Sequence, residues 1–311
     1  MKVPYFVPWI TKADKKCVIN AMNQRWLTLG PTLTKFEDKI RLFIGSKYSI
    51  GVGSATHALH LSVKSLGIGP NDEVIVPTFT FAATANAVSY CGAQPVLVDV
   101  DPDTFNISTK EIERKITERT KAIIAVHYGG QSCDMDKILL ISRKHGLHVI
   151  EDCAHSLGST YKNGKCGSIG QTGCFSFYPT KIITTGEGGM ITTSNLRIYK
   201  KGKLLRSQGM DKLPPDRESK SEWKYDIVDL GYNYRLDEIR ASLGLSQFKM
   251  INQINKARIK IAKKYDMLIK KIKVAKTLPI ATPSAPILLP RNPKTTIRMN
   301  HIPCCLDSAI T

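Results

Sequence analysis

The sequence predicts an α/β protein with a mostly parallel sheet flanked by helices. Three observations support this fold class: short apolar runs, helix-period segments between them, and turn residues at their boundaries. The runs expected to form strands cover residues 49–53, 73–76, 95–98, 122–126, 148–151, 173–177 and 189–193. Strands that alternate with helices at this spacing are typical of parallel sheets with helices packed on both faces.

The intervening helices are expected near residues 56–66, 81–91, 109–116 and 134–145. The last has the clearest boundaries, because Asp134 can cap its first turn and Gly146 can end it in the left-handed conformation. Ligands of such sheets collect at the carboxyl ends of the strands, so we expect the functional residues directly after strands.

Outside this alternating core, residues 1–48 indicate an N-terminal arm and one helix, 205–230 a polar loop, and 235–273 long helices. After Lys276 the chain is rich in proline and shows no clear periodicity. We therefore expect a large domain over 1–235, followed over 236–311 by a helical segment and an incomplete or divergent small domain.

The composition excludes several classes of protein. Of the 311 residues, 42% are hydrophobic and 23% charged, which is typical of a globular protein rather than a disordered one. No run approaches the roughly 18 apolar residues of a membrane span, and the first residues lack the apolar segment of a signal peptide. The eight cysteines form no CxxC pair, so we expect reduced thiols, a cytoplasmic protein and no metal site.

The net charge is +19, and residues 251–311 carry +10 of it, with twelve Lys or Arg against Asp266 and Asp307. A basic cluster of this kind can contact nucleic acid. A solvated basic helix and tail is the more frequent meaning of such a cluster, and the sequence has no aromatic stacking pattern or known binding motif, so we expect no nucleic-acid partner. Weak attraction for an anionic substrate fits both interpretations.

The segment CFSFYPTKIITTGEGGM, residues 174–190, holds a lysine after an apolar strand. Lys181 is placed on a turn where it would reach the ligand edge of the sheet, and partial burial there would lower its pKa and make it a nucleophilic amine. The glycines that follow would let the backbone pass close to a bound group. An ordinary loop lysine beside a tight turn explains this segment equally well.

Two further segments follow strands. In VIEDCAHSLGS, Asp152 ends a strand and His155 lies three residues on, so a carboxylate and an imidazole could meet a ligand. Considered alone, an Asp at the end of a strand more often caps the next segment. In GVGSATHALHLSVKSLG, the N–H groups and hydroxyls at Ser54 and Thr56 could cradle a phosphate, although an ordinary helix cap is the more frequent meaning.

Taken together, the three segments supply phosphate donors, a partner for a ring nitrogen and an amine nucleophile. This set matches pyridoxal phosphate, whose chemistry requires a lysine that reacts with its aldehyde and a carboxylate that holds the pyridinium charge.

The chain resembles the DegT/StrS-type nucleotide-sugar aminotransferases, a group within the type I fold of pyridoxal-phosphate enzymes. The resemblance runs from VPWIT to the helix near residue 273. It rests on WLTLGP, SATHALHL, GPNDEVIVPTFTFAATANAV, PVLVDVDPDTFNI, VHYGGQSCDMD, VIEDCAHSLG, SFYPTK with GEGG, and LGYNYRLDEIRASLGLSQ in the same order. It implies the large domain of a type I aminotransferase.

By this resemblance, Lys181 bonds to the cofactor and shuttles the proton, Asp152 pairs with the pyridine nitrogen, and His155 contacts the phenolic oxygen. Three further kinds of contact are implied: stacking on the ring, phosphate binding in the same subunit, and phosphate binding across a dimer interface. The residues for these contacts are Phe81 for stacking, Ala55, Thr56 and Ser176 beside Ser54 for the phosphate, and Asn233 for the partner's phosphate. A core phenylalanine and a plain turn remain alternatives for Phe81 and Asn233.

The resemblance implies a homodimer with shared active sites. It also implies that glutamate donates an amino group to a nucleotide-linked keto-sugar, in amino-sugar or surface-glycan synthesis. The segments DLGYNYR and SLGLSQ are closer to family members that act at C4 of the sugar. The family's small C-terminal domain has no counterpart in the pattern after Lys276, as in a truncated or frame-shifted gene. A catalytically impaired cofactor-binding or regulatory protein is therefore one alternative. A sugar dehydratase is another, against which Lys181 counts because dehydratases usually have His there.

Overall fold

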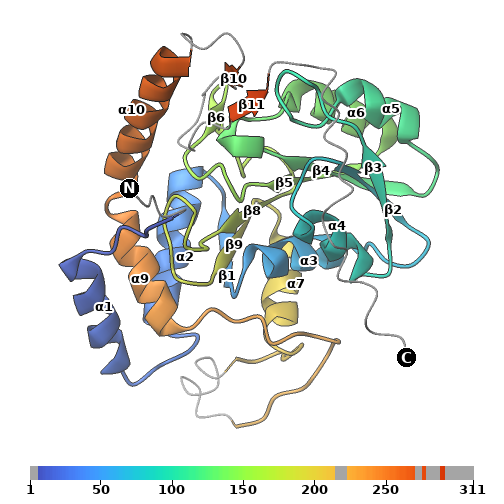
Figure 1. Cartoon of the computed structure of the whole chain (residues 1–311). Coiled ribbons are helices and arrows are strands. Elements are labelled where there is room, and N and C mark those ends of the chain that lie inside the picture. The colour runs from blue at the N-terminus through green and yellow to red at the C-terminus, as the bar shows by residue number, and fades with distance from the viewer. Residues whose placement is uncertain (1–5, 214–222, 270–274, 278–287, 291–311) are drawn as a thin grey trace, which may run out of the picture.

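A seven-stranded sheet of order β1-β9-β8-β5-β4-β2-β3 forms the centre of the protein (Figure 1). The structure is a computed structural model that describes residues 6–213, 223–269, 275–277 and 288–290. The strands are β1 (Tyr48–Val52), β2 (Glu73–Pro77), β3 (Gln94–Val98), β4 (Thr120–Val126), β5 (His148–Asp152), β8 (Thr172–Ser176) and β9 (Gly189–Thr193). All seven predicted strands are confirmed to within two residues, and so is the α/β fold class.

Strand β9 runs opposite to the other six strands of this sheet and pairs antiparallel with β8 and β1. The cause lies in the connection from β8 to β9, residues 177–188, which contains no helix. A return to a parallel orientation needs a crossover of a dozen or more residues, usually helical, whereas a direct return gives antiparallel pairing. The turn that carries Lys181 therefore also reverses the strand, and it brings the start of β9 to the edge where β8 ends.

Helices cover both faces of the sheet. One face carries α3 (Ala55–Ser65), α4 (Ala83–Ser89) and α7 (Leu196–Arg206). The other face carries α2 (Pro31–Ile44), α5 (Thr109–Lys115), α6 (Met135–His145) and α9 (Glu238–Phe248), with α1 (Lys12–Met22) packed on α9. The helices predicted near 56–66, 109–116 and 134–145 are confirmed, whereas the one predicted over 81–91 is shorter.

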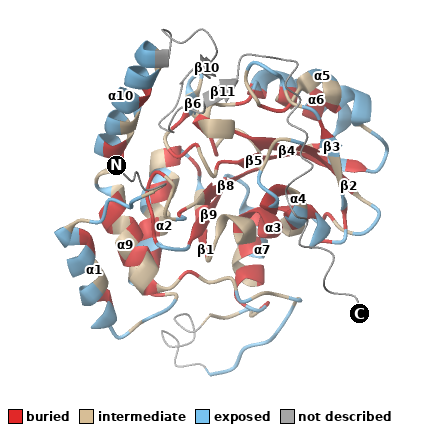
Figure 2. Cartoon of the chain, in the orientation of Figure 1, coloured by how far each residue is buried: buried red, intermediate tan, exposed pale blue. Residues whose placement is uncertain are grey.

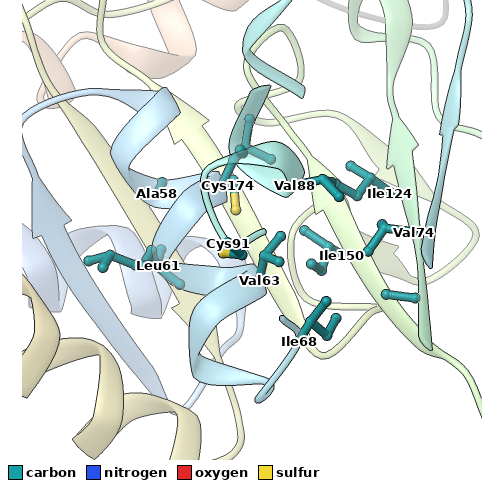
Figure 3. Packing of buried hydrophobic residues seen from close by; sticks show 14 of the residues in the cluster. Ala58, Leu61, Val63, Ile68, Val74, Val88, Cys91, Ile124, Ile150 and Cys174 are labelled. Carbon is teal, nitrogen blue, oxygen red and sulfur yellow. The ribbon is translucent and has the colours of Figure 1, made fainter. Parts of the chain in front are cut away.

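Side chains that alternate along each strand build a separate core on each face. Ile150 and Ile124 point to the α3 side and pack with Leu61 and Val63 (Figure 3), while Val149 points to the α6 side. Apart from the edge strand β3, the strands are accordingly buried along most of their length, and the outer surfaces of α1 and α10 are exposed (Figure 2). Burial on both faces explains why the strands appear in the sequence as continuous apolar runs.

Capping residues define the ends of the helices. In α6 the side chain of Asp134 accepts the N–H of Lys137, and Gly146 has a φ of 65°, as predicted. The N-terminal region holds two helices where one was expected, because Thr11 and Asp14 form a reciprocal cap that starts α1 and Pro31 starts α2.

The C-terminal part begins with α9 and α10 (Ile251–Ile269), as the predicted long helices require. Short strands β10 (Ala275–Thr277) and β11 (Leu288–Pro290) pair with each other, and β6 (Thr160–Tyr161) pairs with β7 (Gly164–Lys165). Residues 270–274, 278–287 and 291–311 lie outside the described part, so the domain boundary after residue 235 stays a prediction. In the described part, no helix has the length and apolar character that crossing a membrane requires.

Candidate active site

The edge formed by the carboxyl ends of the parallel strands gathers the predicted residues. Ser54 follows β1, Asp152 ends β5, and Ser176 ends β8. Gly189 opens the antiparallel β9 at the same edge, where a Cβ on it would lie 2.4 Å from the carbonyl carbon and oxygen of Ser54. The structure therefore brings together segments that are more than 130 residues apart in the chain.

The carboxylate of Asp152 is buried and held from two sides. Its Oδ2 accepts the hydroxyl of Thr84 at 3.0 Å, and its Oδ1 accepts the N–H of Ala154 at 3.1 Å. Burial raises the pKa of Asp152, and these hydrogen bonds and the charge of Lys181 partly offset that effect. A cation placed against this carboxylate would stabilise its ionised form.

Thr84 is a residue of the candidate site that could not be found from the sequence pattern. It lies on α4 and is fully buried, three residues beyond Phe81 in the segment PTFTFAATANAV. The sequence signal that could have pointed to Thr84 is a hydroxyl on a short helix that follows a strand at the ligand edge of the sheet. Only the fold shows that this hydroxyl reaches Asp152.

His155 lies in the turn after β5 with its ring in a defined orientation. Its Nδ1 accepts the N–H of Gly129 at 3.3 Å, so in the neutral ring the proton is on Nε2, which can donate. Burial, with a smaller effect of the charge on Lys181, lowers the pKa of His155 to about 4. The ring is therefore a neutral hydrogen-bond donor at neutral pH.

Lys181 lies on a tight turn in which its own N–H donates to the carbonyl of Tyr178 at 2.9 Å. The side chain is half-buried. Burial lowers the pKa of Lys181, and the charge of Asp152 partly opposes that effect. A lowered pKa increases the fraction of neutral amine, which is the nucleophilic form.

The N-terminus of α3 forms the phosphate end of the candidate site. The hydroxyl of Ser54 accepts the N–H of His57 at 3.1 Å, so Ser54 is the cap of this helix. First-turn N–H groups such as those of Ala55 and Thr56 have no partner within a helix and attract anions. Helix cap and phosphate site, which the sequence offered as alternatives, are therefore compatible at this position.

The remaining three predicted residues lie at different depths. Ser176 is half-buried and accepts the N–H of Tyr178 at 3.4 Å. Phe81 is 81% exposed, which excludes the alternative of a core phenylalanine. Asn233 is exposed and pairs with Ser207 through a backbone bridge. No bond from its side chain to the site is formed within this subunit's described residues.

A buried cluster of His127, Glu151 and Cys153 lies behind Asp152, with its ligand-type atoms all within 4.8 Å of one another. Hydrogen bonds already engage all three side chains, since Cys153 bonds to His127. Glu151 accepts three backbone N–H groups, those of Gly167, Ile169 and Gly170. Its Oε2 also lies 2.9 Å from Nε2 of His127. The other ring nitrogen of His127, Nδ1, accepts the N–H of Cys133. The cluster fixes the loop after β7 against β5, and it gives no reason to infer a metal.

The donor set fits pyridoxal phosphate. A buried carboxylate suits a protonated ring nitrogen, a neutral imidazole N–H suits a phenolic oxygen, a half-buried amine suits the aldehyde, and open N–H groups suit the phosphate. The close approach of Gly189 to Ser54 supports the phosphate end, because a Cβ at this glycine would displace the backbone that forms it.

Comparison with known proteins decides the family. The model of the DegT/DnrJ/EryC1/StrS aminotransferase family matches residues 8–295. The chain belongs to this family. It is 44% identical over 266 residues to GDP-perosamine synthase of Caulobacter vibrioides, and the match covers 85% of this chain and 69% of the relative.

Two further comparisons agree with this assignment. The spore coat polysaccharide biosynthesis protein SpsC of Bacillus subtilis is 42% identical over 87% of this chain and 70% of its own length. The structure of Spr1654 from Streptococcus pneumoniae in its PLP form superposes with a TM-score of 0.84 at 32% identity, and covers 90% of this chain and 74% of Spr1654. The chain thus has the fold of type I pyridoxal-phosphate enzymes, and pyridoxal phosphate is its cofactor.

Proposed function

We propose that this aminotransferase moves an amino group from glutamate to C4 of a nucleotide-linked keto-sugar, in amino-sugar or surface-glycan synthesis. The observation that carries the proposal is the half-buried amine of Lys181 near the buried carboxylate of Asp152, at the edge where α3 begins. The names of GDP-perosamine synthase and SpsC support a nucleotide sugar and a polysaccharide product. The resemblance of DLGYNYR and SLGLSQ to members acting at C4 supports the position.

Pyridoxal phosphate, when bound, supplies an aldehyde and a ring that accepts electrons. Asp152 would accept a hydrogen bond from the protonated ring nitrogen and keep it charged. His155 would donate from Nε2 to the phenolic oxygen. Lys181 would hold the cofactor at its aldehyde and, once released, take the proton from the substrate carbon and return it at the cofactor carbon.

Five other residues would orient the cofactor. Ser54, Ala55 and Thr56 would bind its phosphate at the start of α3, and Ser176 would add a hydroxyl. The exposed ring of Phe81 would stack on the cofactor ring and exclude water from that face.

The amino group that reaches the sugar replaces its keto oxygen, and glutamate leaves as 2-oxoglutarate, so the exchange needs no oxidant or reductant.

We further propose a homodimer in which Asn233 reaches the partner's phosphate. Three exposed apolar side chains close to Asn233 in the chain, Ile227, Val228 and Leu230, support an interface there, since each is at least 59% exposed in the single subunit.

We propose a cytoplasmic location, which the free thiols of the described cysteines support.

Borohydride reduction tests the site. In the wild-type holoenzyme it should fix the cofactor to Lys181, as peptide mass spectrometry would show, and Lys181→Ala should give no adduct. Spectral conversion on adding glutamate, followed by a panel of nucleotide-linked keto-sugars, tests the reaction. Failure of the wild type to convert with glutamate would leave the impaired, cofactor-binding alternative.

Subunit mixing tests the shared site. Lys181→Ala and Asn233→Ala are each expected to be weakly active alone, and a mixture that is allowed to exchange subunits should regain part of the wild-type activity. One site of the mixed dimer then contains both native residues. A mixture no more active than its components would contradict the placement of Asn233 in the partner's site.

A further inference from the structure

Helix α10 contacts both loops that carry the candidate catalytic residues. Its Arg258 donates from Nη2 to the carbonyl of Lys181 at 3.1 Å and, more weakly, to that of Thr180 at 3.5 Å. Its Asn255, nearly one helical turn earlier, donates from Nδ2 to the carbonyl of Leu157 at 3.5 Å. Leu157 lies two residues after His155, so one face of α10 meets both the histidine loop and the lysine turn.

The approach of Asn255 depends on a glycine in the histidine loop. Gly158 has a φ of +97°, and a Cβ on it would lie 2.5 Å from Nδ2 of Asn255. A side chain at position 158 would therefore displace the Asn255 amide from its place and strain the backbone of the loop. The close contact between α10 and the histidine loop is thus supported by the residue types on both sides.

Arg258 is a half-buried cation that interacts with carbonyl groups. Within the described residues, it makes no ion pair with a carboxylate, and its side-chain hydrogen bonds go to the two carbonyls of the lysine turn. Burial lowers the pKa of Arg258, but a guanidinium remains protonated in proteins. Hydrogen bonds from a charged donor are stronger than neutral ones, so the 3.1 Å contact fixes the backbone from which the Lys181 side chain extends.

We propose that Arg258 and Asn255 are positioning residues that hold Lys181 and His155 in their relative orientation, with Arg258 making the stronger contact. This inference rests on the proposed function of Lys181 and His155. An amine that takes and returns a proton must reach two carbon atoms from one backbone position. A displacement of about 1 Å from such a position can reduce a rate by roughly 100-fold.

The test measures the glutamate half-reaction of the holoenzyme by stopped-flow absorbance at saturating cofactor. Arg258→Ala is expected to slow this step by roughly 10- to 100-fold, with the glutamate concentration for half-maximal rate little changed. Asn255→Ala should slow it less, because its contact is longer. Lys256→Ala, an exposed position between them on the same helix, is the control and should match the wild type.

Chemical rescue separates positioning from a general loss of structure. Arg258 lines a cavity of about 400 Å³ that also borders Lys181, Trp9 and Ile261, so a small cation can enter when the side chain is removed. Added guanidinium at low millimolar concentration should restore part of the rate of Arg258→Ala, and ammonium should restore less, because it is more strongly hydrated and lacks the planar shape of the missing group. Arg258→Lys, which keeps the charge and is the safer variant for folding, should be slowed and should respond to neither ion.

The outcomes distinguish the proposed function of Lys181 from the positioning role of Arg258. A wild-type enzyme that forms no reducible adduct at Lys181 overturns the proposed function. A wild type that reacts normally beside Arg258→Ala and Arg258→Lys variants that match Lys256→Ala overturns the positioning role alone. Slowed variants that guanidinium does not rescue overturn it as well, since the loss is then not that of the carbonyl contact.

Discussion

The hydroxyl of Thr84 donates to Oδ2 of Asp152 across 3.0 Å and links helix α4 to the end of strand β5. The same hydroxyl lies 2.8 Å from that of Thr80. Because an ionised carboxylate only accepts, Thr84 must donate to Asp152, and Thr80 must then donate to Thr84. A directed chain of two hydroxyls therefore stabilises the charge that we expect to face the cofactor nitrogen.

Thr84→Val should weaken the binding of pyridoxal phosphate by about 10- to 100-fold. The substitution removes a hydrogen bond to a charged group, which is worth roughly 1.5–3 kcal/mol, and the pKa of Asp152 should rise further. Fluorescence titration of the apoenzyme measures the dissociation constant. Thr78→Val, whose exposed hydroxyl meets Asp99 instead, is the control, and equal affinities for the two variants would contradict the role of Thr84.

Gly189→Ala should reduce both stability and cofactor affinity. The new Cβ would lie 2.4 Å from the carbonyl of Ser54 and 2.7 Å from the nitrogen of Ala55, which are backbone atoms that cannot turn away. Overpacking of this kind costs about 1–3 kcal/mol, and here the displaced atoms form the start of α3. Urea unfolding of the apoenzyme and cofactor titration measure the two effects. Gly69→Ala, whose nearest neighbour would be 3.8 Å away, should change neither.

The sequence predicted the strands and the end-of-strand residues well, because both follow from local patterns. Continuous apolar runs mark strands that are buried on both faces, and Asp152 and Ser54 are the polar residues that follow such runs. Lys181 could be found by the same rule. The antiparallel direction of β9 could not, because the sequence shows the lack of a helix over residues 177–188 only weakly.

Contacts between segments that are far apart in the chain could not be predicted from the sequence. Glu238 lies 208 positions after Gly30, and no local pattern indicates that its carboxylate accepts the N–H groups at the start of α2. The contacts of Arg258 with the lysine turn and of Thr84 with Asp152 were missed for the same reason. Each depends on how helices pack on the finished sheet, which a single sequence does not specify.

Glu238→Gln should destabilise the protein by roughly 2–4 kcal/mol. Oε1 of the carboxylate accepts the N–H groups of Gly30 and Leu33, and Oε2 accepts that of Thr32. The amide keeps one accepting oxygen, places an N–H₂ against a donor, and loses the negative charge at a helix N-terminus. Urea unfolding measures the change, and Glu118→Gln at an exposed position is the control. A loss no larger than that of the control would show that the contact contributes little.

His155→Gln should remove part of the loss of stability at acid pH. The pKa of His155 is about 4 in the folded protein, below its ordinary 6.5 because of burial. The unfolded chain therefore takes up a proton near pH 6.5, where the folded one does not, and the free energy of unfolding falls as the pH drops from about 6.5 to about 4. A displacement of that size corresponds to at most roughly 3 kcal/mol.

Urea unfolding of the apoenzyme between neutral pH and pH 4 measures this effect. The unfolding free energy of the wild type should decline relative to that of His155→Gln over this interval, and His145→Gln at an exposed position should follow the wild type. Gln can also donate an N–H to the phenolic oxygen, so the variant should keep much of its activity at neutral pH. Parallel stability curves for wild type and His155→Gln would mean that His155 takes up its proton at the same pH in the folded and unfolded protein, and the lowering of its pKa by burial would then be wrong.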